Sequence, residues 1–359
     1  MFLLRKKCFF RRALLLVSIL SIVMLPQTAA ARTVSVGLAI GQSSVSVSSS
    51  SALSATDGSG KKHALGTTAV FRSAGTNSVV AGNRTLRLPV SISSRHPLSF
   101  NKRRYRGGFR LVSSGSGITL LNVLDLEEYL RGVLKMEVNP AWSMEALKAQ
   151  AVISRTYALR SVLQNRGKGG YDLRDTVMSQ VYRGMNAEDP KTDQAIRATK
   201  GMVLKYGGEI AFPPFHSHSG GATADVTTVW GGNMPYLKGV NEDFQTESPH
   251  STWEASLSAA QVEDALRSAG VNVGRLQELR VEQSDPFGRP TTLRAIGTSG
   301  SKTLKSHSFR MAAGSNVIRS TLFSISSAAS SSSAPIPLAS LSQPKPVPPS
   351  PPPGTGVPT

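Results

Sequence analysis

Cysteine is almost absent from this chain of 359 residues, and its single cysteine, Cys8, lies close to the N-terminus. If the first residues are removed on export, no thiol remains. Disulfide bonds, thiol catalysis and cysteine-based zinc sites are then excluded. The sequence also has no glycine-rich phosphate loop, dinucleotide fingerprint, His-Glu-x-x-His pair or calcium loop, so nucleotide-dependent and zinc-protease chemistry have no support.

Negative charge is also scarce, because 22 Asp and Glu stand against 41 Lys and Arg. Five basic residues fall in the segment MFLLRKKCFFRR, which an apolar run and the small-residue stretch PQTAAAR follow. This order predicts a signal peptide over residues 1–31 and a protein exported to the periplasm or cell wall. A membrane anchor is the alternative, in which case the uncleaved segment would be the contact with the membrane. The apolar run is shorter than the ~20 residues that span a bilayer.

Cleavage would leave 36 basic against 22 acidic residues, a formal charge of +14. An exported basic protein meets wall polymers and membrane surfaces rather than chromosomal DNA, so we expect no nucleic-acid partner. The basic cluster at 101–108, NKRRYRGG, is predicted to be a solvated loop, and contact with an acidic polymer is the alternative.

The pattern of apolar residues divides the chain into parts of different character. Residues 32–124 alternate apolar and polar side chains in short runs such as TAVFRS and GFRLVSS, which predicts strands. Residues 125–325 add helices, including one at MEALKAQAVISRTYALRSVLQ with Ser143 as its N-cap. Residues 326–359 are rich in Ser and Pro and are predicted to be a disordered tail. The predicted fold class is α+β, with a β-rich N-terminal part.

Glu137 is an acidic residue at an apolar position. On a helix from Leu126, it falls about 20° from the starting direction, within the stripe of Leu130 and Val133. Pro140 must end this helix near Asn139, which places Glu137 in the last turn. Apolar surroundings and the helix dipole would both raise its pKa, as a general acid requires. The alternative is a buried structural glutamate paired with a base such as Arg155.

The stretch HSHSGG at 216–221 is the second candidate. On an extended strand, His216 and His218 would face the same side and could bind a metal. A polar lining of a groove is the favoured reading. A serine hydrolase using Ser217 or Ser219 has little support, because no Gly-x-Ser-x-Gly elbow is present.

Several blocks of this sequence resemble the SpoIID/LytB family, which includes stage II sporulation protein D and amidase enhancers. The blocks are LEEYLRGVLKMEVNPAWSMEALKAQAVISRTYAL, DTVMSQVYRGMNAED, ATKGMVLKYGG and FHSHSGGATADVTTVWGGNMPYLKGV. The resemblance implies one domain over roughly residues 33–325, with a long groove that acts on peptidoglycan. It implies either a lytic transglycosylase or a non-catalytic, wall-binding enhancer of an N-acetylmuramoyl-L-alanine amidase.

The family's catalytic acid maps to Glu137, although the usual Met-Pro after it is replaced by Val-Asn-Pro. The resemblance also implies substrate-binding roles for residues in two family stretches: Arg155, Tyr157, His216, His218, Ser219, Gly220 and Gly221. Some members bind zinc with the help of cysteines. No cofactor is therefore expected here, and His216 and His218 are only weak candidates for a metal.

Overall fold

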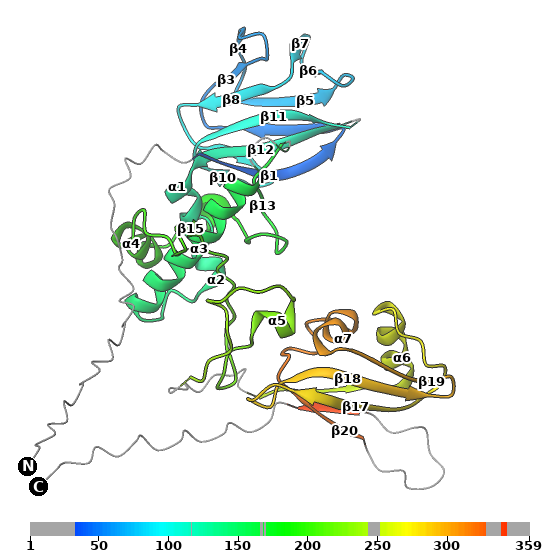
Figure 1. Cartoon of the computed structure of the whole chain (residues 1–359). Coiled ribbons are helices and arrows are strands. Elements are labelled where there is room, and N and C mark those ends of the chain that lie inside the picture. Colours follow the sequence, from blue (N-terminus) through cyan, green and yellow to red (C-terminus); the bar gives the residue numbers. More distant parts are fainter. Residues whose placement is uncertain are drawn as a thin grey trace, which may run out of the picture. The chain divides into compact units, whose positions relative to one another are not determined.

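A computed structural model describes residues 33–115, 117–165, 168, 170–242, 252–327 and 339–342. The predicted signal segment at 1–31 lies outside these residues. No helix in the described ranges is long and apolar enough to cross a membrane. The chain divides into two compact units between Pro213 and Pro214, and each is described separately. The predicted boundary at 124/125 thus falls inside the first unit, where a strand runs into a helix (Figure 1).

The first unit is built on two sheets. The larger one contains, in spatial order, β13 (Leu173–Arg174), β1 (Thr33–Gln42), β12 (Gly117–Asp125), β11 (Gly108–Ser114), β8 (Val90–Ser94), β3 (Leu53–Thr56) and β4 (Lys62–Ala64). The smaller one contains β10 (Arg103–Tyr105), β9 (Leu98–Phe100), β2 (Ser44–Ser48), β5 (Thr68–Ser73), β6 (Ser78–Ala81) and β7 (Arg84–Arg87). Their buried faces follow the period-2 pattern, as in β5, where Ala69 and Phe71 are buried.

Helices follow these strands in the same unit. They are α1 (Leu126–Arg131), α2 (Leu134–Glu137), α3 (Met144–Asn165), the 3₁₀ turn η1 (Gly184–Ala187) and α4 (Pro190–Ala198), before the hairpin β14 (Lys205–Tyr206) and β15 (Glu209–Ile210). The N–H of Ala146 donates to Ser143 Oγ at 3.3 Å, which confirms the predicted cap of α3. Helix α3 buries side chains against α1, α4 and β1, and is the centre of this helical layer.

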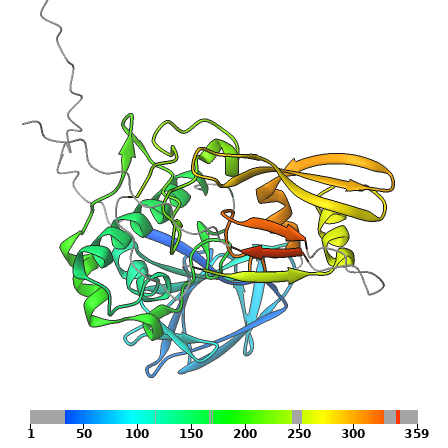
Figure 2. The same cartoon turned by 90° about the horizontal axis from the view of Figure 1, so that it is seen from below.

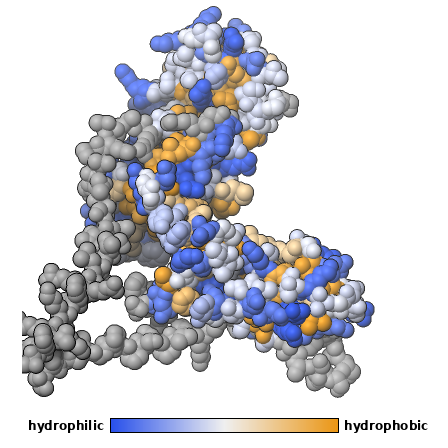
Figure 3. Space-filling view, viewed as in Figure 1, coloured by the Kyte–Doolittle hydropathy of each residue, from blue (hydrophilic) through white to orange (hydrophobic). Residues whose placement is uncertain are grey.

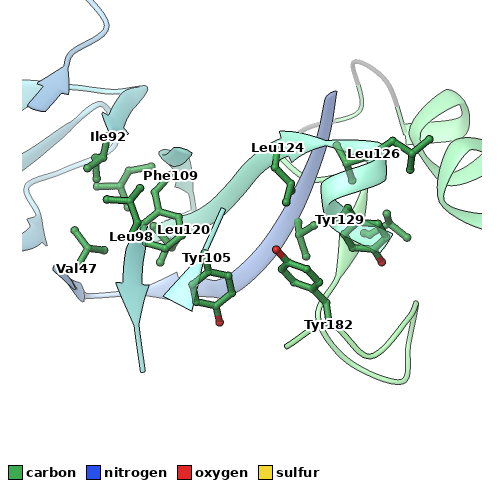
Figure 4. Packing of buried hydrophobic residues seen from close by; sticks show 14 of the residues in the cluster. Val47, Ile92, Leu98, Tyr105, Phe109, Leu120, Leu124, Leu126, Tyr129 and Tyr182 are labelled. Atoms are coloured by element: carbon green, nitrogen blue, oxygen red, sulfur yellow. The ribbon is translucent and has the colours of Figure 1, made fainter. Parts of the chain in front are cut away.

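An aromatic row joins the strands to the helices. The ring centroids of Tyr105 and Tyr182 lie 5.9 Å apart, and those of Tyr182 and Tyr129 lie 5.1 Å apart (Figure 4). The buried Tyr182 hydroxyl donates to Asn122 Oδ1 of β12 at 2.7 Å. The same core therefore supports both the sheet and helix α1.

The basic cluster at 101–108 is not the predicted solvated loop. Asn101 and Lys102 form a tight turn at positive φ, and β10 then pairs with β9. Tyr105 is buried in the core. Arg106 donates to both carboxylate oxygens of Glu188 at 2.6 and 2.9 Å. Strand pairing thus holds part of this segment in the sheet, and the charge of Arg106 is neutralised by an acid of the same unit.

The second unit contains α5 (Val226–Val229), β16 (Glu254–Leu257), α6 (Ala259–Ser268), β17 (Leu276–Ser284), β18 (Pro290–Gly297), β19 (Gly300–Lys305), α7 (Ser306–Ala313), β20 (Ser324–Ser327) and β21 (Ala339–Ser342). Strands β17, β18 and β19 form an antiparallel sheet, and helices α6 and α7 pack against each other on it (Figures 1 and 2). Strand β17 pairs with β18 in antiparallel register. Strands and helices together confirm the α+β prediction.

The predicted tail at 326–359 is described only in part. Residues 326–327 end β20 and residues 339–342 form β21, which pairs with β16 and β20. At these positions the structure differs from the predicted disorder, because the backbone groups of the Ser-rich segments bond to each other as strands. The rest of the range lies outside the described residues.

Candidate active site

Glu137 is positioned by a break in the predicted helix. Instead of one helix through Leu126, Leu130 and Val138, the chain forms α1 and α2 with Gly132 between them. A side chain at Gly132 would meet the Tyr182 ring at 2.3 Å, so this close approach requires glycine. The single-helix prediction was wrong here, and the break lies at a glycine that packs against a residue about fifty positions away.

Within α2, Glu137 still shares a face with a buried residue. It follows Leu134 by three positions, and Leu134 is fully buried. Val138 then takes an extended conformation and ends the helix. Glu137 is therefore the last residue of its helix and is half-buried, as predicted.

The carboxyl group of Glu137 has no cationic partner among the residues that the structure describes. Burial raises the pKa of Glu137, and a hydrogen bond from the backbone N–H of Val181 opposes that rise. The net direction is upward, toward a group that keeps its proton nearer neutral pH than an exposed glutamate would.

Arg155 does not pair with Glu137. Its Nε and Nη2 atoms donate to the two carboxylate oxygens of Glu127, each at 2.8 Å. Its guanidinium also donates to the carbonyls of Met202 and Ile196, both at 3.2 Å. The alternative interpretation was that Glu137 is a structural glutamate paired with a base such as Arg155. That base pairs with Glu127 instead.

The predicted role of Arg155 in substrate binding is corrected by the same contacts. The side chain of Arg155 is 1% exposed, so a sugar chain cannot reach it. A bidentate pair with a buried arginine is a structural feature that joins α1 to α3. Glu127, in the first turn of α1, is therefore one half of a structural ion pair.

Tyr157 lies close to Glu137, as its electrostatics show. Burial raises the pKa of Tyr157, and the Glu137 charge raises it further, while a hydrogen bond with Ser179 lowers it. The fully buried Tyr129 is affected by the same glutamate, after burial and the neighbouring tyrosines. The structure therefore places Tyr157, for which a substrate-binding role was predicted, near Glu137.

The loop segment at residues 179–181 completes the surroundings of Glu137. No role was predicted for it from the sequence. Ser179 bonds to Tyr157, Gln180 accepts from the Tyr129 hydroxyl at 3.3 Å, and Val181 donates to Glu137. Gln180 is buried and also donates to the Ser154 carbonyl at 3.5 Å. The block DTVMSQVYRG was the available signal, but nothing in its pattern indicates which side chains it meets.

Several exposed apolar side chains lie close in sequence to Glu137 or to Ser179. Met136 and Trp142 are 44% and 47% exposed, and Val177 and Met178, which precede Ser179, are 84% and 75% exposed. On the face of the molecule drawn in Figure 3, hydrophobic and hydrophilic residues are interspersed. Exposed apolar and aromatic groups of this kind suit a sugar, which offers both an apolar ring face and hydroxyls.

The residues predicted at 216–221 belong to the second unit, where they form a loop rather than a strand. The N–H of Gly220 donates to His218 Nδ1 and that of Gly221 to Ser219 Oγ, both at 3.0 Å. Ser219, 6% exposed, bonds to the carboxylate of Glu242. Ser219 is therefore tied into the loop, and neither histidine has the strand geometry on which the metal prediction depended.

Metal binding has no support from the arrangement of side chains. No group of three or more His, Cys, Asp or Glu within the described ranges is placed to hold a metal ion. His216 and His218 alone do not supply the ligands of a zinc site, which usually number three or four.

Comparison with known proteins agrees with the motifs around Glu137. Residues 114–206 match the family described as Stage II sporulation protein, SpoIID. Over this range the match supports the resemblance to the SpoIID/LytB family. Glu137, Tyr157 and the segment Ser179–Val181 all fall inside the matched range, whereas the loop at 216–221 falls outside it.

Three relatives illustrate the similarity. An uncharacterized protein of Brachyspira hyodysenteriae is 28% identical over 66% of this chain and 63% of its own length. The Amidase enhancer of Bacillus subtilis is 33% identical over 51% of this chain and 24% of its own. Stage II sporulation protein D of Bacillus subtilis is 31% identical over 40% of this chain and 46% of its own. The matches thus span less than two thirds of each relative.

Proposed function

We propose that this protein is an exported lytic transglycosylase that cleaves peptidoglycan glycan strands with Glu137 as its acid and base. The observation that supports this proposal is the state of Glu137: it is half-buried, raised in pKa and without a cationic partner in the described part of the chain. Structural glutamates that are buried are usually paired. A half-buried glutamate without a cationic partner is better explained by a chemical role.

The proposed reaction needs only one carboxyl group. Protonated Glu137 donates its proton to the glycosidic oxygen as the bond from C1 of N-acetylmuramic acid to O4 of N-acetylglucosamine breaks. The carboxylate then removes the proton from the 6-hydroxyl of the same muramic acid, whose oxygen bonds to C1. The products are an anhydro-sugar end and a free 4-hydroxyl, and no water is consumed. A hydrolytic glycosidase would need a second carboxylate.

Nearby groups can assist this step. The Val181 N–H bonds to the carboxyl group, and Ser179 holds Tyr157 beside it. These contacts fix Glu137 in one orientation before substrate binds, which is the main use of supporting residues at such a site. The Val-Asn-Pro sequence after Glu137 still ends its helix directly after the acid.

The decisive experiment replaces Glu137 with Gln and treats peptide-free peptidoglycan with the purified protein. Mass spectrometry of the soluble fraction should show anhydro-sugar products from the native chain and none from Glu137→Gln. The matched control is Glu145→Gln on α3, whose side chain is 82% exposed and pairs only with Lys148. Full activity in Glu137→Gln would remove the case for this residue.

A second function is supported by one relative, which is named Amidase enhancer. In that case the protein would bind the wall and stimulate an N-acetylmuramoyl-L-alanine amidase without cleaving glycan. The formal charge of +14 on the exported chain favours adhesion to anionic polymers. Binding to peptidoglycan with no anhydro products, together with faster amidase digestion, would favour this function over the enzyme.

A further inference from the structure

A cavity of about 720 Å³ lies entirely within the second unit. Its walls come from residues 214–219, from α5 and the chain after it, from α7, and from residues 319–321 before β20. This volume is in the range of sites that hold a drug-sized ligand. It is large enough for a sugar unit.

The lining of this cavity is positively charged. It includes Lys238, Arg289, Arg310 and Arg319, and no Asp or Glu is among the lining residues that the structure describes. Two of these cations have an acid nearby outside the lining. Lys238 Nζ lies 3.4 Å from Asp225, and Arg289 Nε lies 3.8 Å from Asp285.

Arg310 and Arg319 have no such acid within the described ranges. Arg310 is half-buried, and its Nε and Nη2 donate only to backbone carbonyls, those of Ile318 at 2.8 Å and Arg319 at 3.1 Å. Burial lowers the pKa of Arg310, which means that its charge is poorly solvated where it lies. A partly desolvated cation without a counter-ion is stabilised when an anion binds beside it.

The histidines of the lining add polar groups rather than charge. Burial lowers the pKa of His307, with Arg310 and Lys305 adding to the effect, and burial likewise lowers the pKa of His216. His307 Nδ1 is buried without a hydrogen-bond partner in the described structure. A neutral imidazole can bond a ligand hydroxyl from either ring nitrogen.

Aromatic side chains complete the walls. Phe215, Trp230 and Tyr236 line the cavity and are 41%, 55% and 36% exposed. Exposed aromatic rings beside polar groups suit the apolar face of a sugar ring. A phosphate cradle is less suited to this loop, because the N–H groups of Gly220 and Gly221 already donate to His218 and Ser219.

We propose that this cavity binds a carboxylate-bearing saccharide, with Arg310 and Arg319 contacting the carboxylate and the aromatic residues contacting the ring. N-acetylmuramic acid is the simplest sugar of this class, and its choice rests on the proposed action on peptidoglycan. The geometry of the cavity does not involve Glu137, so ligand binding here and cleavage at Glu137 are separable properties.

Tryptophan fluorescence of the full-length chain tests the proposal. A Trp142→Phe background removes the tryptophan of the first unit and leaves Trp230 and Trp253, which both line the cavity. The probes are N-acetylmuramic acid and N-acetylglucosamine, which differ by the lactyl carboxylate, and glycerol 3-phosphate. N-acetylmuramic acid should quench or shift the emission at concentrations at least about tenfold lower than either of the others, as expected for a charge-assisted contact.

Variants then assign the effect. Arg319→Gln removes an exposed charge and should weaken binding of N-acetylmuramic acid about tenfold. Arg280→Gln, on β17 outside the lining, is the matched control and should bind like the background. Arg310→Lys keeps the charge and should bind more tightly than Arg310→Gln, with folding checked by circular dichroism.

Several results would overturn the proposal. Equal affinity for N-acetylglucosamine would remove the role of the carboxylate, and tighter binding of glycerol 3-phosphate would indicate a phosphate site instead. Equal affinity of Arg319→Gln and Arg280→Gln would remove the named contact. Charge-dependent binding without any anhydro product would keep this site while rejecting the proposed enzyme, and the reverse result would do the opposite.

Discussion

The bidentate pair between Arg155 and Glu127 gives a quantitative test of the structure. Arg155→Met keeps the length of the side chain and removes its charge. It leaves a carboxylate beside a closed core and loses two charge-assisted bonds of 2.8 Å. Breaking an enclosed pair in this way costs about 3–5 kcal/mol of unfolding free energy. The guanidinium is 1% exposed, but Glu127 is 21% exposed, so the lower end of that range is expected.

The assay is urea unfolding followed by the fluorescence of Trp142, in a background where Trp230 and Trp253 are Phe. Trp142 then reports the first unit alone. Lys148→Met is the control, because Lys148 pairs with Glu145 on an exposed helix face and should change the unfolding free energy by less than ~1 kcal/mol.

A double variant sharpens this test. Glu127→Leu combined with Arg155→Met removes both charges together and should recover part of the loss, since neither ion is then left alone. The structural role would be refuted if Arg155→Met and Lys148→Met had the same free energy of unfolding within experimental error. If Arg155→Met also bound substrate more weakly, Arg155 would again be a candidate for a substrate contact.

Two further predictions concern titration. Hydrogen bonds from Ser59 and His63 hold the pKa of Asp57 well below its usual range. The Asp57 carboxylate therefore stabilises the fold at any pH above its pKa in the unfolded chain, and this stabilisation is lost as the pH falls through its lower pKa in the folded protein. Asp57→Asn should therefore flatten the loss of stability in acid, measured by urea midpoints between about pH 2 and 5; an unchanged slope would contradict this. Beyond burial, the Glu137 charge raises the pKa of Tyr157, so Glu137→Gln should lower that pKa in a carbon-13 NMR titration of the tyrosine ring, and no shift would mean that the two groups are not close.

Local patterns in the sequence predict much of this fold. TAVFRS becomes β5 residue for residue, and Ser143 caps α3 where its hydroxyl position indicates. Helix α6 likewise begins at a local signal, because Ser258 and Gln261 form a capping box at its start. In these segments, nearby residues determine both the period and the ends of each element.

The misses all depend on residues distant in sequence. Tyr182 packs against Gly132 at the helix break, and the partner of Arg155 is Glu127 rather than Glu137. The basic segment at 101–108 becomes a strand because β9 is available to pair with it. No local period carries such information, since it arises only when separate segments pack together.

The candidate site was partly predictable for the same reason. Glu137 stands out because an acid at an apolar position is conspicuous in one short segment. Its neighbours Ser179, Gln180 and Val181 have ordinary side chains or use their backbone, and they reach the site only through the fold. Sequence reasoning identifies the unusual residue but not the contacts that tune it.

The most direct test of the central claim is a carbon-13 NMR titration of the Glu137 carboxyl group, assigned by comparison with Glu137→Gln. Burial without a cationic partner predicts a pKa for Glu137 above the usual 4.5. A pKa at or below 4.5 would show that the carboxylate is well stabilised, and Glu137 could not then hold the proton that the proposed reaction requires.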